Sequence, residues 1–146
     1  MGTISTRDAS VAGSVQVNAD RASLISNDSI TAFDHTAPII LTRGGDVLVC
    51  STSQFHLLHA GPTGLVFGLD RGALEIHSTS QPQDIIITPD IRFAVESPGI
   101  YNLRVRVTTN GDTCVDNAGG GSPTLILSDA FSSSNYRLIP GQHVLF

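Results

Sequence analysis

The sequence predicts an all-β fold, a single-domain β-roll or sandwich built from many short strands. Two observations support this prediction. Short apolar runs rich in Val, Ile, Leu, Thr and Phe alternate with turn residues along residues 13–146, at the spacing expected of such folds. In addition, no stretch shows apolar residues at positions i, i+3, i+4 and i+7 over a helical length.

In the N-terminal half, the apolar runs are separated by sequences that favour turns. Arg43-Gly44-Gly45-Asp46 predicts a tight turn between two strands, because glycine adopts the positive φ angles that such turns need. Asp70-Arg71-Gly72 predicts a second turn. The strands predicted in this half cover residues 14–18, 38–42, 46–50, 54–58, 64–69 and 73–77.

In the C-terminal half, the clearest hairpin signal is Asn110-Gly111. This dipeptide lies between two alternating runs, and a type I′ turn needs positive φ at both of its central residues. Pro98-Gly99 separates two further strands. The strands predicted in this half cover residues 84–88, 91–96, 100–108, 123–128, 136–139 and 142–146.

The 146 residues suit one domain with a core of ordinary size. Residues 1–12 show no apolar periodicity, which predicts a flexible N-terminal arm ahead of an all-β domain over residues 13–146. No apolar run approaches the roughly 20 residues of a membrane-spanning helix, so this segment is not expected to insert into a membrane. The first ten residues also lack the apolar core of a signal peptide.

The charge balance argues against binding to nucleic acid. All eight basic residues are Arg, and 13 acidic residues give a formal net charge of -5. Binding to phosphates requires a basic patch that releases counterions, and the arginines are scattered along the chain. Arg104 and Arg106 alternate along one predicted strand, which favours a solvated strand face over a binding patch.

The sequence predicts no catalytic residues, no metal ligands and no cofactor. His56 and His59 are the most suggestive pair, but residues three apart on a strand point to opposite faces unless a bulge intervenes. No serine lies in a Gly-x-Ser-x-Gly motif, and the glycine run at residues 119–121 lacks the Lys and helix of a phosphate-binding loop. The protein is therefore not expected to be an enzyme.

The two cysteines, Cys50 and Cys114, lie too far apart in the sequence for a local redox or zinc motif. Each is part of an apolar run. Two explanations remain open: a pair of buried free thiols, because cysteine behaves as a small apolar residue, or one disulfide in an oxidising compartment.

Several segments together resemble the FecR-type domain of bacterial envelope proteins. The opening strand and the step that follows it are similar to the start of that domain, with Asn27 where Gly is usual. Their sequences are Gly13-Ser14-Val15-Gln16-Val17-Asn18 and Asn27-Asp28-Ser29-Ile30. Strand-turn-strand sequences resemble its next elements: Pro38-Ile39-Ile40-Leu41-Thr42-Arg43-Gly44-Gly45-Asp46-Val47 and Leu69-Asp70-Arg71-Gly72-Ala73-Leu74-Glu75-Ile76. Later segments are similar to an acidobacterial variant of the family: Ile87-Thr88-Pro89-Asp90-Ile91-Arg92, Gly99-Ile100-Tyr101 and Gly111-Asp112-Thr113-Cys114-Val115.

The resemblance implies an exported, β-rich module in the periplasm or outside the cell, whose export signal or anchor is absent from this chain. The best-known members relay iron-uptake signals, which requires a transmembrane segment and a cytoplasmic helix that this chain lacks. Only the module is therefore implied, not the signalling. Of the two explanations for Cys50 and Cys114, an exported location favours the disulfide.

The first functional hypothesis is a non-catalytic domain that binds another envelope protein, a surface component or copies of itself through a strand edge. The predicted interaction strand is Gln142-His143-Val144-Leu145-Phe146. A second hypothesis is a structural subunit of an extracellular filament, coat or surface layer, because few charges would need desolvation. A third is a jelly roll that binds a small ligand or glycan, which would need Phe33, Phe55, Phe67 and Tyr101 exposed on one face.

Overall fold

The computed structural model describes residues 1–13, 16–110, 112–119, 121–129 and 135–145. These residues form 16 strands and no helix, which confirms the predicted all-β class. Accordingly, they include no helix that could cross a membrane.

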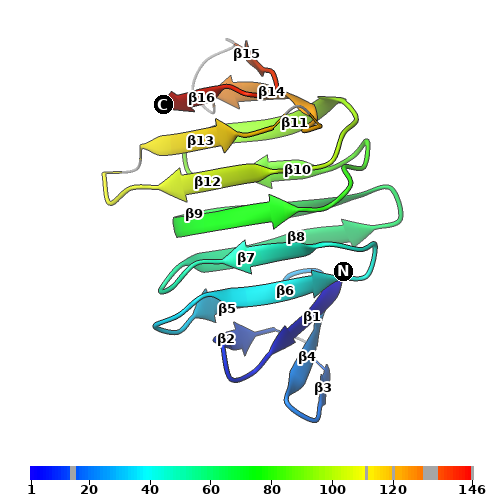
Figure 1. The fold of residues 1–146 in the computed structure, drawn as a ribbon. Helices are drawn as coiled ribbons and strands as arrows, with labels where there is room; N and C mark the ends of the chain where they lie inside the picture. Colours follow the sequence, from blue (N-terminus) through cyan, green and yellow to red (C-terminus); the bar gives the residue numbers. More distant parts are fainter. Residues whose placement is uncertain (14–15, 111, 120, 130–134, 146) are drawn as a thin grey trace.

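The strands form two layers that face each other (Figure 1). Both layers run from an N-terminal end of the molecule, at β1–β4, to a C-terminal end, at β13–β16. Sheet 1 has the order β3 (Gln16–Asn18), β4 (Arg21–Leu24), β1 (Gly2–Ser5), β6 (Ala37–Leu41), β7 (Asp46–Val49), the C-terminal part of β9 (Gly64–His77), β12 (Leu103–Val107), β13 (Thr113–Asn117) and β16 (His143–Leu145). Sheet 2 has the order β2 (Ala9–Ala12), β5 (Ser29–Ala32), β8 (Gln54–Gly61), the N-terminal part of β9, β10 (Ile85–Ile87), β11 (Ile91–Ser97), β14 (Thr124–Asp129) and β15 (Asn135–Leu138).

The core lies between the two sheets and follows the two-residue period of the strands. On β12, Leu103, Val105 and Val107 are buried while Arg104 and Arg106 are exposed. The buried apolar residues of both sheets belong to one cluster. Among the described strands, β9 and β10 pair in parallel, and the other pairs are antiparallel.

Strand β9 joins the two layers. The sequence predicted a turn at Asp70-Arg71-Gly72, and this prediction was wrong, because the chain continues through it as one strand of 14 residues. The strand changes sheets near Gly72, whose φ of 90° suits glycine. A Cβ at Gly72 would overlap the hydroxyl of Ser53. Sequence alone cannot distinguish such a corner from a turn, because both need the same residue types.

The two predicted hairpins are present. Strands β6 and β7 pair as far as Ile40 opposite Asp46, around Gly44 and Gly45, which both have positive φ. Strands β12 and β13 pair as far as Val107 opposite Thr113, while Gly111 of the predicted turn lies outside the described residues.

Residues 1–12 are not the flexible arm that the sequence predicted. Strand β1 lies between β4 and β6, and its Ile4 is fully buried in the core. Strand β2 pairs with β5, with Ala9 buried. Each strand has only four residues, several of them small or polar, so neither produces an apolar pattern that stands out in the sequence.

Candidate functional site

The structure places Cys50 and Cys114 on the outer face of sheet 1 as two free, partly exposed thiols. The Cys50 N–H donates to the Ala73 carbonyl, Ala73 pairs with Arg106, and Arg106 pairs with Cys114. The cysteines are therefore three strand spacings apart, roughly 14 Å. A disulfide requires Cα atoms within about 7 Å, so of the two explanations that the sequence left open, the possible disulfide does not form in this fold and both thiols are free.

The Cys50 thiol is in an environment that disfavours the thiolate. Burial raises its pKa, and the negative charge of Glu75 raises it further, while Arg104 acts in the opposite direction. A thiolate is the reactive form of cysteine, so a raised pKa reduces nucleophilicity.

Of the predicted interaction strand Gln142–Phe146, residues His143–Leu145 form β16 at the C-terminal edge of sheet 1. Gln142 precedes the strand, and Phe146 lies outside the described residues. The Asn117 N–H donates to the Gln142 carbonyl over 2.9 Å. Antiparallel pairs alternate, so the next hydrogen-bonded pair is Val115 with Val144, and the backbone N–H and C=O groups of Leu145 point away from β13. Within the described chain, β16 has no partner on that side.

An open trough of about 340 Å³ lies beside this edge. Side chains of β12, β13 and β16 line it, and we call it the edge trough. Leu145 forms part of its rim and is 68% exposed, whereas Val144 on the opposite face of the strand packs against the core. The edge therefore combines unpaired backbone groups with an apolar side chain and a cavity.

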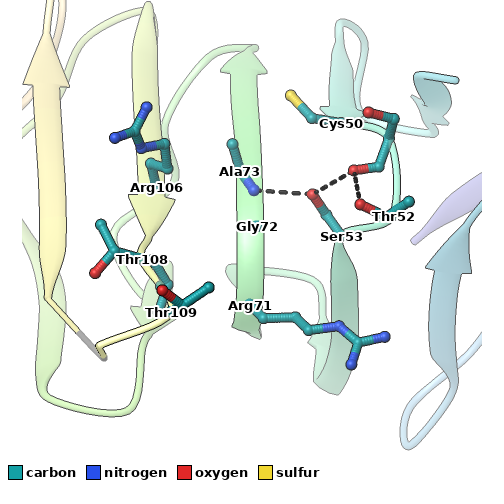
Figure 2. A pocket seen from close by; sticks show the side chains of 11 residues that line it. Cys50, Thr52, Ser53, Arg71, Gly72, Ala73, Arg106, Thr108 and Thr109 are labelled. Carbon is teal, nitrogen blue, oxygen red and sulfur yellow. Dashed lines mark hydrogen bonds between the residues drawn. The ribbon is translucent and has the colours of Figure 1, made fainter. Parts of the chain in front are cut away.

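A larger groove, of about 600 Å³, lies where β9 passes from sheet 2 to sheet 1 (Figure 2). Residues 50–53 line one side, residues 106–109 line the other, and residues 71–73 lie between them. We call it the corner groove. The Ser53 hydroxyl holds the corner in place by accepting a hydrogen bond from the Ala73 N–H at 2.8 Å.

The sequence does not predict the corner groove. It predicts a turn at Arg71 and a solvated strand face at Arg106. The groove draws on three segments that are distant in the chain, and only the fold brings them together. The one local signal is Gly72, which the sequence could not distinguish from an ordinary turn glycine.

His56 and His59 lie on the same face of sheet 2, contrary to the alternation expected of a regular strand. A bulge between Leu57 and His59 shifts the register, so His56 pairs with Gly68 and His59 with Val66. The His56 ring covers Gly68, and its Nδ1 lies 3.1 Å from a carboxylate oxygen of Asp70. Among the described residues, no three His, Cys, Asp or Glu side chains are grouped so as to hold a metal.

A buried polar cluster surrounds Asp84. The Asp84 carboxylate is 2% exposed and accepts hydrogen bonds from Arg43 Nη1 at 2.8 Å, the Leu65 N–H at 2.9 Å, the Gln81 N–H at 3.0 Å and the Tyr101 hydroxyl at 3.0 Å. Burial, together with the charge of Asp84, raises the pKa of Tyr101. Four donors occupy the hydrogen-bonding sites of this carboxylate, so no acceptor oxygen remains for a ligand. The cluster instead links loops and strands through hydrogen bonds.

The four aromatic residues proposed for a sugar-binding face do not share an exposed surface. Phe55, Phe67 and Tyr101 are 0%, 2% and 3% exposed, and only Phe33 among the four candidates reaches the surface. The Phe55 and Phe67 rings contact each other in the core, with centroids 5.3 Å apart.

No protein-family model matches this chain, and neither the curated proteins nor the solved structures include a match.

Proposed function

We propose that this chain is a non-catalytic domain of the bacterial envelope, of the FecR type, that binds a protein partner by adding a strand to β16. The observation that carries the proposal is the open edge of β16. Strand addition joins an extended segment to a sheet through backbone hydrogen bonds, while pockets beside the edge select its side chains.

Proteins protect exposed edges with Lys, Pro, a covering loop or a very short edge strand. Of these features, the described residues give β16 only the last, because the strand has three residues. The described β16 has the sequence His143-Val144-Leu145, and the Leu145 side chain is largely exposed. The edge trough lies over β13 on the inner side of β16, so a long side chain of an incoming strand would reach it across Leu145.

The envelope location and the family rest on the sequence segments that resemble FecR-type domains. The strand-addition mechanism rests on the geometry of β16 and does not depend on the family.

The test uses two substitutions of one residue. Leu145→Pro removes the outward N–H of β16 without removing a hydrogen bond to β13, whereas Leu145→Thr changes the side chain and keeps that N–H. A photo-crosslinking residue at position 145 captures the partner from envelope extracts. A peptide of the captured segment is then titrated against both variants and the parent protein.

We expect Leu145→Pro to weaken binding of the peptide at least tenfold more than Leu145→Thr does, with the thermal midpoints of both variants close to that of the parent. Two results would overturn the proposal: no captured segment, or equal affinity of the two variants for it.

A second candidate function, a structural subunit, is favoured by the N-terminal end of the sandwich. There β3 and β2 are also edge strands. Val17 of β3 is 59% exposed although its partner Ala22 is fully buried, so the core side of β3 is open to solvent. Copies stacked end to end would continue both sheets.

A further inference from the structure

The corner groove shares only Arg106 with the edge trough, and it carries an inference that does not depend on the proposed function. Two arginines line it, Arg71 and Arg106, and none of its lining residues is acidic. The closest carboxylates along the same strand have partners elsewhere. Asp70 contacts His56 at 3.1 Å, and Glu75 lies 3.7 Å from Arg104.

These two arginines differ from most of the others in the described chain. Five have a carboxylate or hydroxyl partner: Arg7 with Asp20, Arg21 with Thr3, Arg43 with Asp84, Arg104 with Glu75 and Arg137 with Glu96. Arg71, Arg92 and Arg106 have no such partner among the described residues. In a protein with 13 acidic and eight basic residues, two of the three arginines without such a partner among the described residues therefore line one groove.

The geometry of the groove limits the shape of its ligand. Figure 2 shows Arg106 on one side of the Gly72–Ala73 segment and the side chain of Arg71 extending toward the other side. The residues on the floor between the two arginines are Gly72 and Ala73, whose side chains take up little space. Hydroxyl groups at Ser51 and Thr109 add neutral hydrogen-bonding groups along the walls.

We propose that the corner groove binds an extended anion that carries two or more carboxylate or phosphate groups. Guanidinium groups form paired hydrogen bonds with the planar oxygens of carboxylates and phosphates. One anionic group is bound by Arg106 and another by Arg71, with the ligand lying across Gly72 and Ala73. An acidic oligosaccharide and an oligophosphate share this chemistry.

The experiment titrates the full chain with two probes, trigalacturonate for carboxylates and tripolyphosphate for phosphates. Binding is followed by backbone amide shifts in NMR spectra and by calorimetry. The groove variants are Arg71→Gln and Arg106→Gln. The matched control is Arg92→Gln, which removes an equally unpaired arginine from the outer face of sheet 2 on β11.

We expect at least one probe to bind and to shift amides at residues 50–53, 71–73 and 106–109. Each groove variant lowers its affinity at least fivefold, while Arg92→Gln changes it less than twofold. Affinity falls as salt rises, because the interaction is between charges. The probe that binds more tightly identifies the carboxylate or phosphate source.

Three outcomes would overturn the inference: neither probe binds at millimolar concentration, the shifts lie away from the groove, or Arg92→Gln weakens binding as much as the groove variants do. Because the probes contain no peptide, failure here leaves the strand-addition proposal intact, and the reverse also holds.

Discussion

At the scale of single residues, the contacts of Asp84 and of His35 differ in burial. Asp84 is buried and has four hydrogen-bond donors, so its removal would leave the Arg43 guanidinium without a charge partner in the interior. His35 lies at the surface, with Nε2 2.9 Å from Asp8 Oδ1 and Nδ1 3.0 Å from Asp34 Oδ1. The first contact is buried, whereas the second lies at the surface and involves a histidine whose pKa is raised.

The contacts of His35 predict a pH-dependent contribution to stability. Both ring nitrogens can donate only when the imidazole is protonated, so the hydrogen bonds with Asp34 and then Asp8 raise the pKa of His35. Because the folded pKa exceeds the unfolded value of about 6.5, the contribution is fully present below that value and is lost as pH rises through the folded pKa. Urea midpoints measured from pH 5 to pH 9 should show the parent protein more stable than His35→Gln at pH 5 and equal to it at pH 9.

Salt provides the control for this prediction. The three side chains are exposed or partly exposed, so 0.5 M NaCl should reduce the difference at pH 5. A difference that is the same at both ends of the pH range would show that His35 contributes by packing instead.

At the scale of elements, the corner of β9 is the feature on which the arrangement of the two sheets depends most. Gly72→Ala introduces a side chain at φ 90°, and its Cβ overlaps the Ser53 hydroxyl that accepts the Ala73 N–H. We expect a loss of about 2–3 kcal/mol in the free energy of unfolding. Gly44→Ala is the matched control, because φ is 97° there but no atom lies within 4 Å of the added Cβ.

The control variant should lose only the backbone cost, about 1 kcal/mol. Denaturant unfolding of both variants measures the difference. Equal losses would mean that the contact with Ser53 contributes nothing, and that the corner tolerates a side chain as readily as an ordinary turn does.

How far sequence predicts this molecule differs between its elements. The hairpins around Gly44 and Asn110 were predictable, because their turns depend on residue types a few positions apart. Strand β1 was not, because Ile4 is buried only once β4 and β6 lie on either side of it. The corner groove was not predictable from the sequence either, since its walls come from segments that only the two-layer fold brings together. Pairing between distant segments does not appear in a local pattern.

At the scale of the whole molecule, the described strands leave an unpaired edge strand on each sheet at both ends of the sandwich, which raises the question of what binds there. The edge strands are short: three residues each in β3 and β16, and four each in β2 and β15. An end-to-end contact between copies would therefore form few hydrogen bonds. Association also costs several kcal/mol in lost translational and rotational freedom.

The residue types at the N-terminal end also fit the edge trough poorly. The edge strands there have the sequences Gln16-Val17-Asn18 and Ala9-Ser10-Val11-Ala12, which offer no aromatic or long apolar side chain to fill the trough beside β16. A foreign segment with a larger side chain would fill it better. This mismatch favours a partner of different sequence over a second copy.

We therefore expect the purified chain to remain monomeric, at its composition mass of 15.4 kDa, in light scattering on a sizing column from the micromolar to the high micromolar range. A constant mass is consistent with a binding module whose β16 edge is unpaired in the absence of a partner. A mass that rises continuously with concentration would contradict this prediction and favour the structural subunit, because two open ends allow growth without limit. Leu145→Pro separates a β16-mediated assembly from other association: it stops the growth only if copies pair through that edge.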